Sequence, residues 1–143
     1  WAVASSTEPV SVAEVREAAG ALLAGRLDAV PFRGEFEPRL PATGGLDRLR
    51  FERQAVGLLP DGGRHRAAAW LFRVGGRRPL QGVLAVLPVA QVDAPPEADS
   101  IADREYVVAG NAVAWTEGEF VYVCYVDGGI DDLLRRLGDG PIA

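Results

Sequence analysis

The chain has 143 residues, 48% of them hydrophobic and 24% charged, a composition that fits a globular chain with enough apolar material for one core. Its formal net charge of −5 argues against a nucleic-acid-binding surface, because such a surface needs a basic face. The single cysteine excludes an intrachain disulfide and a cysteine-based zinc site. We therefore expect one domain that spans residues 1–143.

The first predicted element is a helix with a clear N-terminal signal. Ser11 and Glu14 have the spacing of a capping box, in which the serine hydroxyl accepts from a first-turn amide and the glutamate reaches back. Val10 and Val15 occupy the hydrophobic-staple positions on either side of this cap. Apolar residues then recur at helical spacing, and Gly25 marks the expected end of the helix.

Residues 31–46 predict an irregular segment, because they contain three prolines and three glycines. Phe32, Phe36 and Leu40 recur within it at intervals of four. We expect the two aromatic side chains to pack the segment against the core.

Alternating polar and apolar residues predict strands after this segment. The expected strands cover residues 49–54, 67–74, 82–87, 106–115 and 120–126. The third of these is almost wholly apolar, so we expect it at the centre of the sheet. The last two flank a glycine turn and predict a hairpin.

A short helix is expected after Gly129, because acidic residues fill its first turn and arginines its last. Short loops between most neighbouring strands predict antiparallel pairing. The expected fold class is therefore α+β, with an N-terminal helix packed on a roughly five-stranded antiparallel meander sheet and a short C-terminal helix.

Residue types that perform catalysis or bind metals are sparse. His65, the one histidine, lies between two arginines, a cationic setting that opposes metal binding. Cys124 lies within an expected core strand, where a cysteine acts as a small hydrophobic residue. Three pairs of carboxylates could perform acid–base chemistry, although each also fits a loop, a hairpin or a helix first turn. They are Glu35 with Glu37, Glu117 with Glu119, and Asp131 with Asp132. We predict no catalytic, cofactor-binding or metal-binding residue.

Two groups of residues could bind a partner or a ligand. Arginines that flank the strand at 67–74 could form a docking patch for an acidic protein surface, or could protect a sheet edge from unwanted pairing. They are Arg64, Arg66, Arg77 and Arg78. Four aromatic residues could line a small-molecule pocket between the first helix and the sheet, or could be ordinary core. They are Trp70, Phe72, Trp115 and Tyr122.

The C-terminal third has a recognisable order of features. Residues 111–126 contain a strand closed by Trp115, a glycine turn and an aromatic strand, and a leucine-containing helix follows at 131–134. An N-terminal helix, a Pro/Phe stretch at 31–36 and a hairpin strand at 66–74 precede them. In this order the chain resembles the extracytoplasmic domain of bacterial transmembrane anti-sigma factors.

The resemblance implies a non-catalytic sensor or protein-interaction domain of a membrane-anchored transcription regulator. Such a domain would lie on the extracytoplasmic (periplasmic) face of the bacterial cell membrane, anchored by a span upstream of Trp1. It would contact a protein partner or a regulatory protease, whereas the module that binds the sigma factor would be cytoplasmic and lie outside these residues. A small-molecule binding module and an enzyme that uses carboxylates stay open as alternatives.

Overall fold

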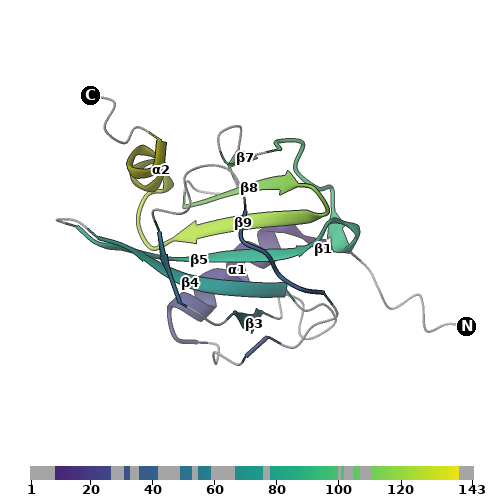
Figure 1. Cartoon of the computed structure of the whole chain (residues 1–143), viewed down its shortest axis with the longest axis horizontal. Helices are drawn as coiled ribbons and strands as arrows, with labels where there is room; N and C mark the ends of the chain where they lie inside the picture. The colour runs from purple at the N-terminus through teal and green to yellow at the C-terminus, as the bar shows by residue number, and fades with distance from the viewer. Residues whose placement is uncertain are drawn as a thin grey trace, which may run out of the picture.

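A seven-stranded sheet carries the helix α1 (Val12–Leu23) on one face, and the short helix α2 (Ile130–Gly138) lies at one end of it (Figure 1). The computed structural model describes residues 9–26, 31–32, 36–41, 49–52, 55–58, 67–75, 78–99, 101, 105–106 and 111–138. The predicted α+β class is confirmed, with one helix near each end of the chain. Within the described residues, no helix is long and apolar enough to span a membrane.

The helix α1 begins at the predicted cap. The Ser11 hydroxyl accepts a hydrogen bond from the Glu14 amide at 3.1 Å and donates to the Glu14 carboxylate at 3.3 Å. Val10 and Val15, the predicted staple pair, are both buried. The local sequence therefore fixes where the helix starts and which side of it enters the core.

The strands of the large sheet are antiparallel and follow the order β2-β4-β5-β9-β8-β7, with β3 also paired to β4. The long strands are β4 (Ala67–Val74), β5 (Leu80–Pro88), β8 (Ala112–Glu117) and β9 (Phe120–Val126). The short strands are β2 (Arg50–Phe51), β3 (Val56–Leu58) and β7 (Glu105–Tyr106). The apolar strand β5 lies inside the sheet, as predicted. The order departs from a simple meander because β9, the last strand in sequence, pairs with β5.

A second sheet of two short strands connects the start of α1 to the loop after β5. In it β1 (Val10–Ser11) runs parallel to β6 (Val92–Asp93), which follows the 3-10 helix η3 (Val89–Gln91). Val10 lies opposite Val92, and both are buried in the core beneath α1.

The strand predicted at 106–115 is two strands. Tyr106 of β7 is the antiparallel partner of Val113 of β8, so the chain reverses between them. Gly110 and Asn111 interrupt the apolar run in the sequence, and such a pair favours a turn. The hairpin predicted from β8 to β9 is confirmed, with Glu117 opposite Phe120.

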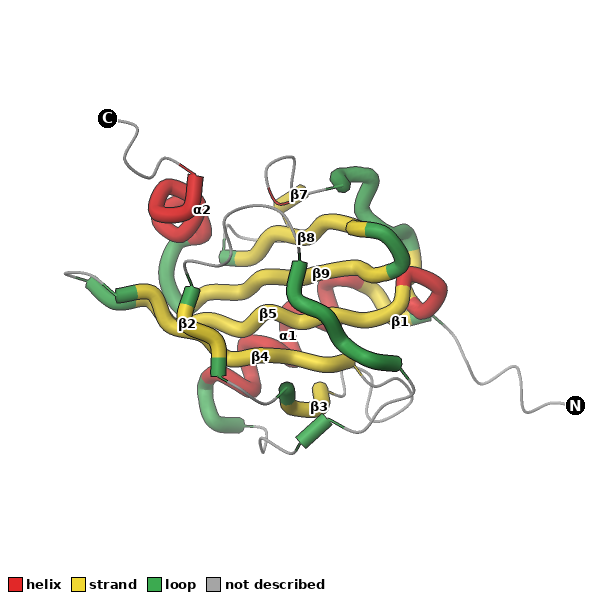
Figure 2. The backbone as a smooth tube through the Cα atoms, viewed as in Figure 1, coloured by secondary structure: helices red, strands yellow, loops and turns green. Residues whose placement is uncertain are grey.

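The two faces of the sheet have different coverings. One face packs against α1, and its side chains from β4, β5 and β8 are mostly small, including Ala67, Ala69 and Ala114. The other face carries the large side chains and packs against α2 and against the irregular segment that contains Phe32 and Phe36. In Figure 2 part of this segment, residues 36–41, lies in front of the strands while α1 lies behind them. We call residues 36–41 the strap.

Candidate binding groove

The four aromatic residues predicted to line a pocket beside the first helix lie on the opposite face of the sheet. Trp70, Phe72, Trp115 and Tyr122 all belong to the buried cluster that α1 does not touch, and none is more than 7% exposed. Trp70, Trp115 and Tyr122 therefore do not line a space beside α1, whereas Phe72 lines a cleft together with Leu23 of α1. The physical reason is the alternation of side chains along a strand, which directs Ala67 and Ala69 of β4 toward α1 and directs Trp70 and Phe72 away from it.

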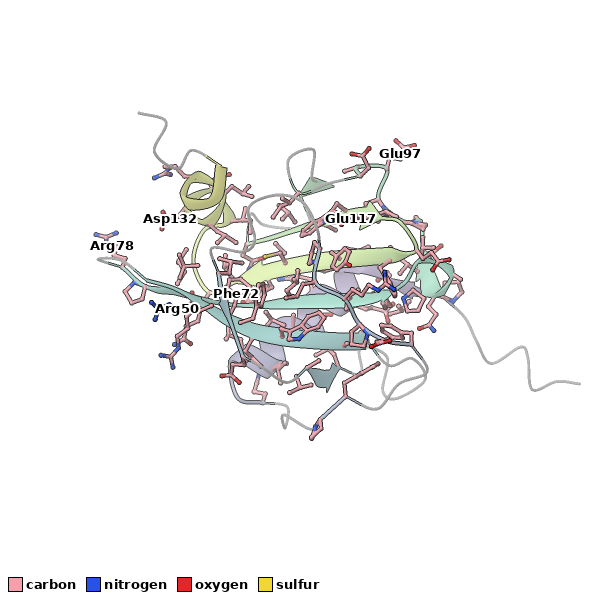
Figure 3. The ribbon with its side chains drawn as sticks, in the orientation of Figure 1. Arg50, Phe72, Arg78, Glu97, Glu117 and Asp132 are labelled. Carbon is pink, nitrogen blue, oxygen red and sulfur yellow. The ribbon has the colours of Figure 1, made fainter. Side chains whose placement is uncertain are left out.

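Of the arginines predicted to form a docking patch, Arg78 is exposed near the turn between β4 and β5, whereas Arg64, Arg66 and Arg77 lie outside the described residues, as does His65. Two arginines on neighbouring strands lie opposite each other nearby. Arg50 of β2 is the register partner of Arg73 of β4, and both line a cleft of about 310 Å3. Figure 3 shows Arg50 and Arg78 toward the same end of the sheet.

A larger concave surface lies between the strap and the hairpin of β8 and β9. Its volume is about 580 Å3, within the range of roughly 300–1,000 Å3 that is usual for ligand sites. Its lining residues are Phe36, Glu37, Arg39, Leu40, Glu117, Gly118, Glu119, Phe120 and Tyr122. We call this surface the strap groove. Only Tyr122 among the predicted pocket residues contributes to it.

One hydrogen bond and a row of aromatic rings hold the strap against the sheet. The Tyr122 hydroxyl donates to the Arg39 carbonyl oxygen at 2.9 Å. The ring of Phe36 lies 5.6 Å from that of Phe120 and 5.1 Å from that of Phe32, centroid to centroid. These are the distances of favourable tilted aromatic pairs. The strap thus forms a fixed wall of the groove.

The phenol of Tyr122 is neutral at physiological pH. Burial, and to a smaller extent the nearby Glu117 carboxylate, raises its pKa to about 12, while Arg39 acts in the opposite direction. The hydroxyl is therefore a hydrogen-bond donor to the strap over the whole physiological range.

The charge of the groove is negative. The hairpin turn places Glu117 and Glu119 at its rim, with Gly118 between them at a φ of 63°. A positive φ at the first central residue is what a type II′ turn requires, and glycine adopts it without strain. Glu37 of the strap adds a third carboxylate against one guanidinium, that of Arg39.

The other predicted chemical groups are not brought together. Glu35, the predicted partner of Glu37, lies outside the described residues, and Asp131 and Asp132 lie in the first turn of α2. Cys124 is fully buried in β9, and burial raises its pKa to about 12. Among the described residues there is no group of three or more histidine, cysteine, aspartate or glutamate side chains that could hold a metal ion.

Comparison of the chain with protein-family models, with curated proteins and with solved structures finds no match.

Sequence reasoning missed most of the groove. It assigned Phe36 to core contacts, which is confirmed, and gave no role to Leu40, which is 45% exposed. It treated Glu117 with Glu119 as a possible acid–base pair or as a hairpin tip, and not as part of a binding surface. A signal was present around Leu40, because Pro38 stands two residues before it and Pro41 follows it directly. An apolar residue in such a rigid segment is readily presented to solvent.

Proposed function

We propose that this chain is a non-catalytic extracytoplasmic sensor or protein-interaction domain of a membrane-anchored transcription regulator of the anti-sigma-factor kind. Its recognition surface is the strap groove. The order of sequence features that resembles those domains supports the first part. The second part is carried by one observation, the concave surface of about 580 Å3 that combines aromatic, aliphatic and charged side chains from two segments distant in sequence.

The groove suits binding better than catalysis. It is open to solvent, since Glu37, Arg39, Leu40 and Glu119 are all exposed, whereas catalytic sites generally exclude water around the reacting atoms. The one thiol, Cys124, is on a buried part of β9, and its raised pKa of about 12 leaves almost no thiolate at neutral pH. Recognition of a partner therefore accounts for the side chains of the groove more simply than an enzymatic reaction.

A reporter experiment in the bacterium that carries the gene tests the recognition surface. Leu40→Gln in the full-length regulator removes the exposed apolar side chain of the strap, and Ala13→Gln makes an equally polar change on the exposed face of α1. We expect the first variant to alter transcription from the regulated promoter at equal protein level, and the second to leave it at the wild-type value. Equal output from both variants and the wild type would contradict a role for the groove.

Protease accessibility tests the location. In spheroplasts, added protease is expected to cleave this domain of the full-length protein while cytoplasmic marker proteins stay intact. Full protection of the domain in intact spheroplasts, with cleavage only after lysis, would contradict an extracytoplasmic position.

A further inference from the structure

We infer that the strap groove receives an extended segment of a partner protein that carries a lysine or arginine beside an apolar residue. This inference rests on the proposed function, because it concerns the same groove, and it adds the chemistry of the partner. Three properties of the groove support it: its charge, its apolar surface and its open shape.

The charge of the groove selects a cation. Glu37, Glu117 and Glu119 line it, and even if Arg39 offsets one of these carboxylates, two negative charges remain. The loop that carries Glu97 is hydrogen-bonded to β8 next to the hairpin, so a further exposed carboxylate lies at this end of the sheet (Figure 3). An acidic concave surface attracts and orients a basic partner before contact is made.

The apolar surface of the groove indicates that the partner supplies an apolar side chain as well as a cation. Phe36 and Phe120 are half-buried, and their rings pack against each other at 5.6 Å. Leu40 is the exposed large hydrophobic residue of the described chain, at 45% exposure, and it lies in the same groove. An aliphatic or aromatic side chain of the partner would cover these groups, and the gain is about 25 cal/mol for each Å2 of apolar surface removed from water.

The open shape favours a peptide segment over a small metabolite. Small-molecule sites usually enclose most of the ligand surface. Here five lining residues are exposed, namely Glu37, Arg39, Leu40, Gly118 and Glu119. Because Gly118 has no side chain, the rim is low between the two hairpin carboxylates. An extended peptide of a partner can therefore lie along the groove and continue beyond it at both ends.

Selection from a random peptide library on the immobilised 143-residue chain tests the inference. We expect enriched peptides to contain lysine or arginine next to a leucine, phenylalanine or similar residue. Synthetic peptides from the enriched set are then titrated by fluorescence anisotropy against the wild type, Leu40→Gln and the two glutamate variants that follow. Glu37→Gln with Glu119→Gln should weaken binding roughly tenfold, since each exposed ion pair contributes a factor of roughly two to five. Glu52→Gln removes one carboxylate charge on an exposed residue beside β2, outside the groove, and should change binding less than twofold.

The outcomes separate this inference from the proposed function. The selection could instead enrich acidic or uncharged peptides that bind Leu40→Gln more weakly than the wild type. That result would overturn the inference of a cationic partner and would still support the groove as a recognition surface. Equal loss of binding in the Glu52→Gln variant would mean that the effect is one of net charge only, which overturns the inference. Peptide binding that no groove substitution changes, or no enrichment at all, would contradict both proposals.

Discussion

Gly82, near the start of β5, lets a large aromatic side chain lie across the sheet. A Cβ added at this position would lie 2.5 Å from the backbone oxygen of Tyr125 and would overlap the ring of Phe72. Phe72 is 2% exposed and packs edge-on against Phe51 of β2, at 5.6 Å between ring centroids. Because Gly82 carries a hydrogen where alanine has a methyl group, β5 can pair with β9 while Phe72 packs over it against Phe51.

Replacement of Gly82 by alanine is expected to lower the free energy of unfolding by about 3 kcal/mol, because neither the Tyr125 backbone nor the Phe72 ring can move without loss of packing. Urea denaturation measures the change. Gly75→Ala is the matched control, since an added Cβ there meets no atom within 4 Å, and it should stay within about 0.5 kcal/mol of the wild type. Similar losses in the two variants would contradict the steric argument.

The Tyr122 hydroxyl connects the strap to the sheet. Tyr122→Phe should destabilise the chain by only about 1 kcal/mol, because the carbonyl of the exposed residue Arg39 can then bond to water. Hydrogen exchange should increase at the strap amides and not in β5. Tyr125→Phe, on the same strand but facing α1, serves as the control. Unchanged exchange at the strap in Tyr122→Phe would mean that the aromatic contacts alone hold it.

At the scale of elements, α1 has a defined end as well as a defined start. Gly25 has a φ of 79°, so that the Arg26 amide donates to the Ala21 carbonyl at 2.8 Å and the Gly25 amide to the Leu22 carbonyl at 3.1 Å. This is the Schellman motif, which satisfies carbonyls left over at the end of a helix. Both ends of α1 are therefore set by local hydrogen bonds, independently of the sheet.

Replacement of the cap residue tests this independence. Ser11→Ala removes the acceptor of the Glu14 amide and should lower the free energy of unfolding by about 1 kcal/mol. Ser11→Thr keeps a hydroxyl at the same place and should recover most of the loss. Chemical denaturation monitored by circular dichroism measures both, and a threonine variant as unstable as the alanine variant would argue against capping.

At the scale of the whole molecule, the cleft lined by Arg50 and Arg73 and the acidic strap groove lie at opposite ends of the sheet. Arg73 pairs with Gln81 at the start of β5, whereas Phe120, next to Glu119, pairs with Pro88 at its end. The cleft that contains two arginines and the acidic strap groove are thus separated by the length of the central strand. A protein with a modest net charge can in this way present a locally strong negative surface to a partner.

Stability is expected to fall at alkaline pH because two buried acids are neutral in the folded chain. The pKa of Tyr122 rises from 10.0 to about 12 and that of Cys124 from 9.0 to about 12, each mainly by burial. Both groups ionise more readily in the unfolded chain, so their contribution is complete below pH 9 and is lost as pH rises from 9 to 12. The part due to Tyr122 is on the order of 2 kcal/mol at pH 12.

Urea denaturation at a series of pH values from 7 to 12 measures this loss. The double variant Cys124→Ala with Tyr122→Phe should be less stable than the wild type at pH 7 but should show a flatter decline above pH 9. An equally steep decline in the double variant would assign the alkaline loss to other groups.

The candidate site could be predicted only in part. Tyr122 was predicted as a binding residue and lies in the groove, but its partner Arg39 is 83 positions away in the sequence. The hairpin that carries Glu117 and Glu119 was predicted, whereas its position opposite the strap was not. Periodicity indicates which side chains share a face of a strand and leaves open which face the helix covers.

The sequence by itself determined the elements whose signals are local: α1 from its cap and apolar spacing, the β8–β9 hairpin from its glycine turn, and the interior position of β5 from its apolar residues. Only the tertiary structure decided that β9 inserts beside β5, that the aromatic residues face away from α1, and that the strap meets the hairpin to form a groove. The physical reason is the distance along the sequence over which the interactions act. Caps, turns and alternation depend on neighbours within a few residues, whereas the groove depends on packing between segments that the chain brings together only when the whole sheet has formed.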